Sequence, residues 1–283
     1  MTDQEPLVIV DQPAPAVRRI TMNRPHKRNA INRPLQDAIL AALREGDGDP
    51  AVRVQVLRGA GPCFSAGYDL SGDAEYGGES QGDGQWPRRV TEAWTSIWDL
   101  AKPVIAQVHG YCLAGGSELA TGCDLVYVAT DAQIGYPAVR FGVPDMHFHV
   151  WFVGMRRAME MMVTGDAITG IEAAQLGWAN RAVPADDLEA TVLEVASRIV
   201  KIPPDVAQIN KRIVHRGMEI MGLRTALRAG TEACALGTHQ ASLQEFLEEV
   251  RQHGLTAALS ARDAAFGDYR TTHESSATLP NGQ

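Results

Sequence analysis

The sequence lacks the features expected of a membrane, exported or nucleic-acid-binding protein. No apolar run approaches the roughly 20 residues that a membrane-spanning helix needs. The N-terminus MTDQEPLVIVDQ has no basic start followed by an apolar segment, as a signal peptide would have. The formal net charge is −8 and the pI is near 5.5, which disfavours non-specific binding to nucleic acid. We therefore expect a cytoplasmic protein with neither membrane nor nucleic acid as a partner.

Cysteine is also scarce, with only four in 283 residues and no CxxC or other spacing typical of metal sites. The cysteines lie among apolar neighbours, so we expect free buried thiols in a reducing compartment. His147 and His149 could point to the same side of an extended segment, as metal ligands can. No pattern of cysteines or carboxylates accompanies them, so we expect no metal site. The four cysteines are Cys63, Cys112, Cys123 and Cys234.

Short strands and helices alternate over the first 140 residues, which predicts an α/β fold. Strands over 7–10 and 17–23 flank a turn containing Pro13 and Pro15 and are expected to pair as a hairpin. Residues 71–89 are rich in Gly, Ser and acids and are typical of a mobile surface loop. The other expected elements are helices at 34–46 and 91–100 and strands at 52–60, 102–110, 124–130 and 132–136.

Beyond Gly142 the pattern is mainly helical, and NRAVP (180–184) is the only strand that we expect there. The pair Pro203–Pro204 is the best boundary for a C-terminal helical unit. The sequence thus predicts a core over 1–203 and a helical region over 204–283 for oligomerisation. The polar tail from about 271 is expected to be disordered.

Two segments share one design, in which an apolar strand leads through small residues into the start of a helix. They are VQVLRGAGPCFSAGYDL (54–70) and PVIAQVHGYCLAGGSELA (103–120). Small residues let a substrate approach the main chain, and amides at a helix start have no acceptor within the helix. Two such amides converging on one point would bind an oxyanion, and one such donor is typically worth about 10²–10³ in rate.

Four motifs in order make a specific resemblance visible. They are NRPHKRNAIN (23–32), FSAGYDL (64–70), HGYCLAGGSELATGCDLVYVATDAQIGYP (109–137) and VTGDAITGIEAAQLGWANRAVP (163–184). Their order and spacing across about 16–184 resemble the crotonase superfamily, the enoyl-CoA hydratase/isomerase family. The resemblance implies an α/β spiral of ββα units with a C-terminal helical region that supports trimers or dimers of trimers. It also implies an acyl-CoA thioester as ligand and no separate cofactor, since CoA is part of the substrate.

Carried over motif by motif, the resemblance assigns a catalytic role to Glu118 and the oxyanion amides to Ala66 and Gly115. These amides would hold the thioester oxygen as it becomes an enolate. Glu118, three residues after Gly115, matches one of the family's two acid–base glutamates and would move a proton near the thioester. The alternatives are a helix-capping glutamate and turn residues needed only for packing.

The family's second glutamate is missing, because Ala138 stands at its place in YPAVRFG. Alanine cannot transfer a proton, so ordinary two-glutamate hydration is in doubt. Asp145 lies close to where some dienoyl-CoA isomerases of the family carry a catalytic aspartate, and it is our candidate for a substitute acid. His109, before Gly110, is expected to be structural.

Three basic residues in NRPHKRNA are candidates for contacts to the CoA phosphates, the alternative being a solvated basic turn. Ser65 and Ser117 raise the alternative of a serine nucleophile, which needs a base within hydrogen-bond reach. Trp86, Trp94 and Trp98 either line the acyl pocket or pack in the core. The expected substrate-binding residues are Arg24, Lys27, Arg28, Ser65, Gly67, Asp69, Leu70, Gly116 and Ala138.

The sequence therefore predicts an enzyme that acts on an acyl-CoA thioester through an enolate, by double-bond isomerisation or by hydration. A CoA-thioester hydrolase or decarboxylase of the same family is one alternative. A non-catalytic acyl-CoA-binding protein that has lost its second acid is another.

Overall fold

The computed structural model describes residues 5–71, 84–144 and 148–267. Its larger sheet has the strand order β1-β2-β3-β4-β6-β9. β1 pairs with β2 in an antiparallel manner, and the remaining pairs are parallel. β3 and β4 are almost wholly buried, as expected for parallel strands covered on both faces. The strands are β1 (Val8–Ala14), β2 (Val17–Met22), β3 (Val54–Gly59), β4 (Val104–Val108), β6 (Leu125–Ala129) and β9 (Arg181–Val183).

A smaller sheet has the order β5-β7-β8, with β5 (Tyr111–Leu113), β7 (Gln133–Gly135) and β8 (Ile168–Thr169). β4 is followed directly by β5 and a helix, and β6 by β7, so successive turns of the chain add one strand to each sheet. Isolated bridges, Ile31 to Tyr68 and Ser65 to Cys112, continue this second layer. The chain is thus an α/β spiral of ββα units, as predicted. β8 was not predicted, because two residues are too few for a periodic pattern.

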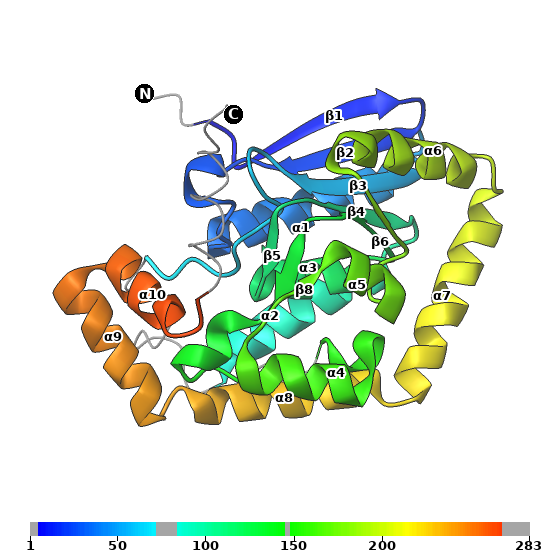
Figure 1. The fold of residues 1–283 in the computed structure, drawn as a ribbon. Coiled ribbons are helices and arrows are strands. Elements are labelled where there is room, and N and C mark those ends of the chain that lie inside the picture. Colours follow the sequence, from blue (N-terminus) through cyan, green and yellow to red (C-terminus); the bar gives the residue numbers. More distant parts are fainter. Residues whose placement is uncertain (1–4, 72–83, 145–147, 268–283) are drawn as a thin grey trace, which may run out of the picture.

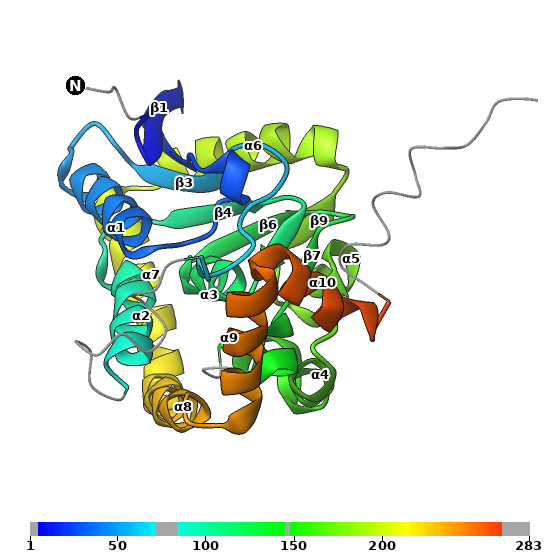
Figure 2. The same ribbon diagram turned by 90° about the vertical axis from the view of Figure 1, so that its left-hand side faces the viewer.

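Helices cover the sheets and close the lower side of the molecule (Figures 1 and 2). α6 lies along the larger sheet at the top, whereas α7 descends at one side and α8 runs beneath (Figure 1). The helices are α1 (Arg33–Gly48), α2 (Gln85–Thr95), α3 (Gly115–Gly122), α4 (Val150–Thr164), α5 (Gly170–Leu176), α6 (Leu188–Val200), α7 (Pro204–Ile220), α8 (Leu223–Gly237), α9 (Ala241–His253) and α10 (Leu255–Ala264). Short 3₁₀ helices are η1 (Pro25–Lys27), η2 (Ser96–Asp99), η3 (Pro137–Phe141) and η4 (Ala185–Asp187).

Several predicted boundaries were wrong for identifiable reasons. β1 continues through Pro13, which an edge strand tolerates, and its register shifts between Asp11 and Ala14. The last residues of the predicted loop 71–89 are helical, because α2 begins at Gln85; residues 72–83 lie outside the described part. Within the helical region expected from 204 onwards, the chain divides at Gly222, whose φ of 102° is incompatible with a continuous α-helix. The tail expected to be disordered from about 271 also lies outside the described residues.

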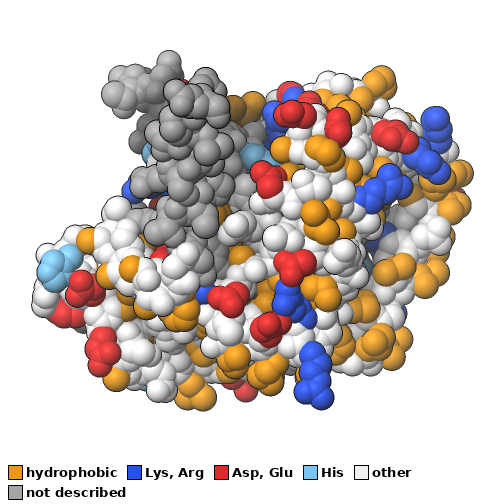
Figure 3. Space-filling view, in the orientation of Figure 1, with side chains coloured by type: hydrophobic (Ala, Val, Ile, Leu, Met, Phe, Trp, Pro, Cys, Tyr) orange, Lys and Arg blue, Asp and Glu red, His pale blue; other side chains and the backbone are white. Residues whose placement is uncertain are grey.

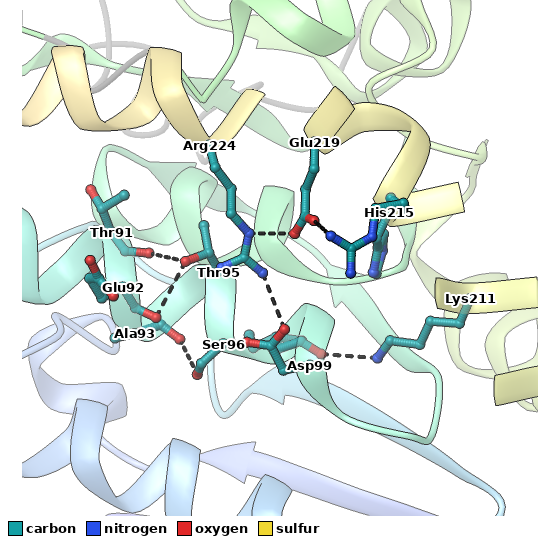
Figure 4. Close-up of polar contacts among 12 residues, drawn as sticks. Thr91, Glu92, Ala93, Thr95, Ser96, Asp99, Lys211, His215, Glu219 and Arg224 are labelled. Carbon is teal, nitrogen blue, oxygen red and sulfur yellow. Dashed lines mark hydrogen bonds and ion pairs between the residues drawn. The ribbon is translucent and has the colours of Figure 1, made fainter. Parts of the chain in front are cut away.

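Polar contacts attach α7 and α8 to the core, and those of α7 are largely buried. The Lys211 ammonium, on α7, lies 2.9 Å from the Asp124 carboxylate and donates to the carbonyls of Ile97 and Lys102. His215 stacks on Trp98, with ring centroids 4.3 Å apart. Figure 4 shows Lys211 and His215 beside Arg224 of α8, which contacts both Glu219 of α7 and Asp99 of η2. The C-terminal helices are therefore bound to the core by charge as well as by apolar packing.

An apolar stripe remains exposed along α7, formed by Val206, Ile209, Ile213 and Ile220. Their spacing places them on one side of the helix. Figure 3 shows hydrophobic side chains spread over the lower edge and the side where α4 and α7 lie in Figure 1. No helix within the described ranges is long and apolar enough to cross a bilayer.

Candidate active site

The two glycine turns lie against each other. The Ser65 N–H donates to the Tyr111 carbonyl at 2.9 Å, and the Leu113 N–H donates to the Ser65 carbonyl at 3.0 Å. A Cβ atom added to Gly116 would lie 2.7 Å from the Ser65 carbonyl oxygen, and one added to Gly67 would lie 2.9 Å from the Leu113 carbonyl oxygen. The glycines therefore allow an approach of two main-chain segments that any side chain would prevent.

Helix α3 begins at this junction, with Gly115 as its first residue. The amide of a first helical residue has no acceptor within the helix, and the helix dipole adds positive potential there. Ala114, immediately before it, has φ 46° and ψ −120°, a conformation that favours glycine. Its carbonyl accepts the Glu118 N–H at 3.0 Å. A strained residue at a helix start is typical of a functional site.

Glu118 lies in the first turn of α3 and is completely buried. Its Oε2 accepts a hydrogen bond from the Tyr68 hydroxyl. The Trp94 indole Nε1 in turn donates to the Tyr68 oxygen at 3.0 Å. The structure thus brings a phenol and an indole to the predicted acid–base glutamate, so that a buried carboxylate is hydrogen-bonded, as it must be to remain charged.

The amide of Ala66 does not have the role predicted for it. Its N–H donates to the Arg28 carbonyl at 3.0 Å, and the next amide, that of Gly67, donates to Ser65 Oγ at 3.1 Å. This main-chain pairing with the segment around Arg28 directs the Ala66 amide to the protein itself. The prediction of Ala66 as an oxyanion donor was therefore wrong.

The basic turn at 24–28 packs directly on the glycine turn, since the Ala66 N–H donates to the Arg28 carbonyl and Ser65 Oγ donates to the carbonyl of the next residue, Asn29, at 2.8 Å. The Arg24 guanidinium is largely buried and lies 2.8 Å from the Asp69 carboxylate. Lys27 and Arg28 are exposed on the same turn. Arg24 and Asp69 thus hold the two segments together, whereas Lys27 and Arg28 present their charges to solvent.

Burial raises the pKa of both the Asp69 carboxyl and the Cys63 thiol, but only at Asp69 do other interactions outweigh it. Burial pushes the pKa of Asp69 up, but hydrogen bonds from Ser71 and Arg24 outweigh it and hold this pKa below its ordinary value of 3.8. Burial raises the pKa of the Cys63 thiol to about 11, although nearby Arg28 opposes the rise. Asp69 is therefore an ionised structural group, and Cys63 is an unreactive thiol.

Both serines considered as nucleophiles are buried, and each hydroxyl donates to a main-chain carbonyl. Ser65 donates to Asn29, and Ser117 donates to Ala114 at 2.7 Å. The buried His149 places Nε2 2.9 Å from Ser117 Oγ, a pair that the sequence did not reveal. Ser117 Oγ also lies 3.3 Å from the Gly135 carbonyl, so two main-chain carbonyls compete with His149 for the single hydroxyl proton.

Ala138, at which the resemblance places the family's second glutamate, lies in η3 and is buried at 6% exposure. Asp145, the candidate substitute acid, lies outside the described residues, as does His147. Leu70 is half-buried beside Asp69. Within the described part of the chain, no group of three His, Cys, Asp or Glu side chains could hold a metal ion.

Sequence reasoning missed Tyr68 and underestimated Trp94. Tyr68 stands in the quoted motif FSAGYDL, directly after Gly67, and its aromatic character beside a glycine turn was the available signal. Trp86 contacts the Tyr68 ring edge-on, with centroids 4.8 Å apart. Trp94 and Trp98 belong to the buried core, which agrees with core packing, one of the two roles predicted for them.

Comparison with known proteins shows the family to which the chain belongs. The profile of the enoyl-CoA hydratase/isomerase family matches residues 13–268. A putative enoyl-CoA hydratase, EchA13, of Mycobacterium tuberculosis is 35% identical over 231 residues, which cover 74% of this chain and 73% of the relative. The mevalonyl-coenzyme A hydratase sidH of Aspergillus fumigatus is 31% identical over 246 residues, covering 81% and 86%.

Solved structures agree with the sequence relatives. An enoyl-CoA hydratase from Mycobacterium smegmatis superposes with a TM-score of 0.87 at 31% identity, covering 95% of this chain and 97% of that one. An enoyl-CoA hydratase/isomerase from Xanthobacter autotrophicus gives 0.85 at 33% identity, covering 93% and 99%. Sequence and fold agree over nearly the whole chain, and the protein belongs to the enoyl-CoA hydratase/isomerase family of acyl-CoA-processing enzymes.

Proposed function

We propose that this enzyme moves a proton beside the thioester carbonyl of an enoyl-CoA, with Glu118 as the acid–base group and main-chain amides as the oxyanion site. The observation that carries the proposal is the position of Glu118, which is fully buried one helical turn after the first amide of α3. A carboxylate there lies within the same small region as the Gly115 amide. The Gly115 amide can therefore stabilise charge that develops on the thioester oxygen while Glu118 moves a proton at the neighbouring carbon.

The oxyanion site is proposed to combine the amides of Gly115 and Tyr68. The Ile31 N–H donates to the Gly67 carbonyl, and the Asp69 N–H donates to the Ile31 carbonyl. Successive peptide groups of an extended segment point to opposite sides. The Tyr68 N–H therefore points away from Ile31, which makes it a better second donor than the Ala66 N–H.

Double-bond isomerisation is the reaction that one carboxylate can complete alone. Glu118 takes a proton from the α-carbon of a 3-enoyl-CoA, and the electron pair of the broken C–H bond moves into a new double bond between the α-carbon and the thioester carbon, which places the negative charge on the thioester oxygen. The resulting dienolate is held by the two amides until Glu118 returns the proton to the γ-carbon, which leaves the double bond between the α- and β-carbons of a 2-enoyl-CoA. Alanine at 138 is compatible with this cycle because no second proton carrier is required.

Hydration is the second candidate, favoured by relatives named as hydratases. Adding water across a 2-enoyl-CoA requires one group to take a proton from water while the α-carbon gains one. Asp145 is proposed for the second role in that case. A mechanism with a serine nucleophile gains less support, because main-chain carbonyls accept hydrogen bonds from both candidate hydroxyls.

Two exposed cations are proposed to receive the CoA phosphates. Lys27 and Arg28 lie on the turn that packs on the 65–67 segment, so a ligand bound there reaches the Gly115 amide with its thioester end. We further propose that the helices from Pro204 onwards mediate trimers or dimers of trimers. The exposed apolar stripe of α7 supports this assembly, since such stripes are rarely left in water.

A paired absorbance assay separates the two candidate reactions. Loss of the conjugated thioester absorbance of crotonyl-CoA reports hydration, and its gain from a 3-enoyl-CoA reports isomerisation. Glu118→Gln should lower either rate by about 10²–10⁴-fold while CoA affinity is retained. Glu245→Gln, on an exposed position of α9, is the matched control and should have no effect. Undiminished turnover in the Glu118 variant would exclude this residue from the mechanism.

A further inference from the structure

The side chain of Tyr68 contacts both parts of the proposed site, although no role is assigned to it. Its hydroxyl donates to Glu118, and its ring lies against Gly115, where an added Cβ atom would come within 2.5–2.6 Å of the ring atoms. We infer that Tyr68 is a positioning residue that holds the Glu118 carboxylate ionised and oriented beside the Gly115 amide. This inference rests on the proposed acid–base function of Glu118.

The direction of the hydrogen bonds follows from their chemistry. An indole N–H can only donate, so Trp94 Nε1 must donate to the Tyr68 oxygen, 3.0 Å away. The single phenolic proton is then directed to Glu118 Oε2. A carboxyl group that accepts a hydrogen bond from a neighbouring hydroxyl is best accommodated in its ionised, acceptor-only form. Trp94 therefore fixes the direction of both hydrogen bonds: the indole donates to the Tyr68 oxygen, and the Tyr68 hydroxyl donates to Glu118.

Burial makes this hydrogen bond important. Glu118 and Trp94 are completely buried, and Tyr68 is only 9% exposed. An ionised carboxylate in such surroundings is costly unless hydrogen bonds stabilise its charge. A hydrogen bond to a charged group is also stronger than one between neutral groups. The Tyr68 hydroxyl thus compensates for water that the apolar surroundings exclude.

Packing fixes the phenol as firmly as its polar contacts do. The Trp86 ring stands edge-on to the Tyr68 ring at an interplanar angle of 80°. Gly115 lies against the same ring, so rotation of the Tyr68 side chain would require α2 or α3 to move. One rigid group therefore contacts the residue that carries the proposed oxyanion amide and the residue that carries the carboxylate. That arrangement sets their relative position, on which proton transfer depends steeply.

Alanine at position 138 makes the ionised state of Glu118 more important for the proposed reaction. Without a glutamate at position 138, Glu118 must both remove and return the proton in the proposed cycle. It must be ionised when the substrate arrives and must regain that state after each turnover. A fixed phenolic donor at Oε2 favours that starting state, and no second carboxylate at position 138 is present to share the task.

Tyr68→Phe tests the inference, because it removes only the hydroxyl and keeps the ring against Gly115 and Trp86. With whichever enoyl-CoA is turned over, we expect kcat to fall roughly 10- to 100-fold, the usual effect of losing a hydrogen bond to a charged group. KM should stay within about threefold, since the ring and the amides remain. Tyr127→Phe, which alters a buried tyrosine of β6, is the matched control and should leave kcat unchanged.

A spectroscopic readout is independent of turnover. The indole N–H resonance of Trp94, assigned by its loss in Trp94→Phe, should shift in Tyr68→Phe and stay in place in Tyr127→Phe. Thermal unfolding of each variant confirms that the fold is retained. Wild-type kcat in Tyr68→Phe, an effect on KM alone, or an unmoved Trp94 resonance would overturn the inference.

The role of Tyr68 and the proposed function can fail separately. Turnover that is lost in Glu118→Gln but kept in Tyr68→Phe overturns only the inference about Tyr68. Turnover that survives Glu118→Gln removes the proposed function and, with it, this role for Tyr68.

Discussion

Replacing Lys211 by methionine should destabilise the protein more than any surface substitution on the same helix. The Lys211 ammonium is buried at 4% side-chain exposure, 2.9 Å from Asp124 Oδ2, and donates to the carbonyls of Ile97 and Lys102 at 2.9 and 3.0 Å. Figure 4 shows this side chain reaching from α7 to η2. Methionine has a similar length but leaves the Asp124 carboxylate and both carbonyls without this donor.

The expected cost is about 3–5 kcal/mol, the usual effect of removing one partner of a buried ion pair. For a chain of this size, each kcal/mol lowers Tm by roughly 2–4 °C, so we expect a fall of about 6–20 °C. His215 Nε2, 3.1 Å from the other Asp124 oxygen, limits the loss towards the lower figure.

The measurement is urea and thermal unfolding at one fixed protein concentration, because assembly would otherwise change the apparent stability. Lys201→Met, at the exposed end of α6, is the control and should change the free energy of unfolding by less than about 0.5 kcal/mol. Adding Asp124→Asn to Lys211→Met should recover part of the loss, because no unpaired charge then remains buried. A loss below about 1 kcal/mol in Lys211→Met would refute the reasoning.

Two further predictions concern the turns around the site. The folded-state pKa of Asp69 is held below its ordinary value, so its contribution to stability is present above that value and is lost as the pH falls through the folded-state pKa. Asp69→Asn should therefore be less stable than wild type to urea at pH 7, with a gap that closes towards pH 3; a gap independent of pH would contradict this. Ala114→Gly should raise the free energy of unfolding by up to about 1 kcal/mol, because relief of strain exceeds the entropic cost of glycine. Urea unfolding measures this change, and a loss of stability would show that Ala114 is unstrained at φ 46°.

The fold could be predicted because its signals are local and repeated. Strand and helix periodicities identified most elements of the core, and the glycine turns marked where the two sheets approach each other. Boundaries failed where one residue decides them, as at Gly222, which divides α7 from α8. Pro13 gave the opposite error, since a turn was predicted there and the strand β1 continues through it. An edge strand tolerates a proline that an inner strand would not.

The site was only partly predictable, since it depends on pairing between distant segments. The direction of the Ala66 amide is set by the carbonyl of Arg28, and that of the Tyr68 amide by the bridge to Ile31. Neither partner can be identified from spacing within the glycine motif. The hydrogen bond from Tyr68 to Glu118 likewise needs α2, which brings Trp94 to the phenol, and no periodicity reports that contact.

In the proposed site, main-chain amides stabilise the negative charge and side chains transfer the proton. The proposed oxyanion site belongs to the main chain, and its glycines are required by sterics, because a Cβ at Gly115 or Gly116 would collide with Tyr68 or Ser65. The proposed proton-transfer groups are side chains, and Ala138 lies in η3, outside the two glycine turns that form the main-chain junction. We therefore expect substitution at such a position to change the reaction while the proposed oxyanion site is kept. Members of this family should therefore differ in reaction chiefly through the acids and donors placed around the start of α3.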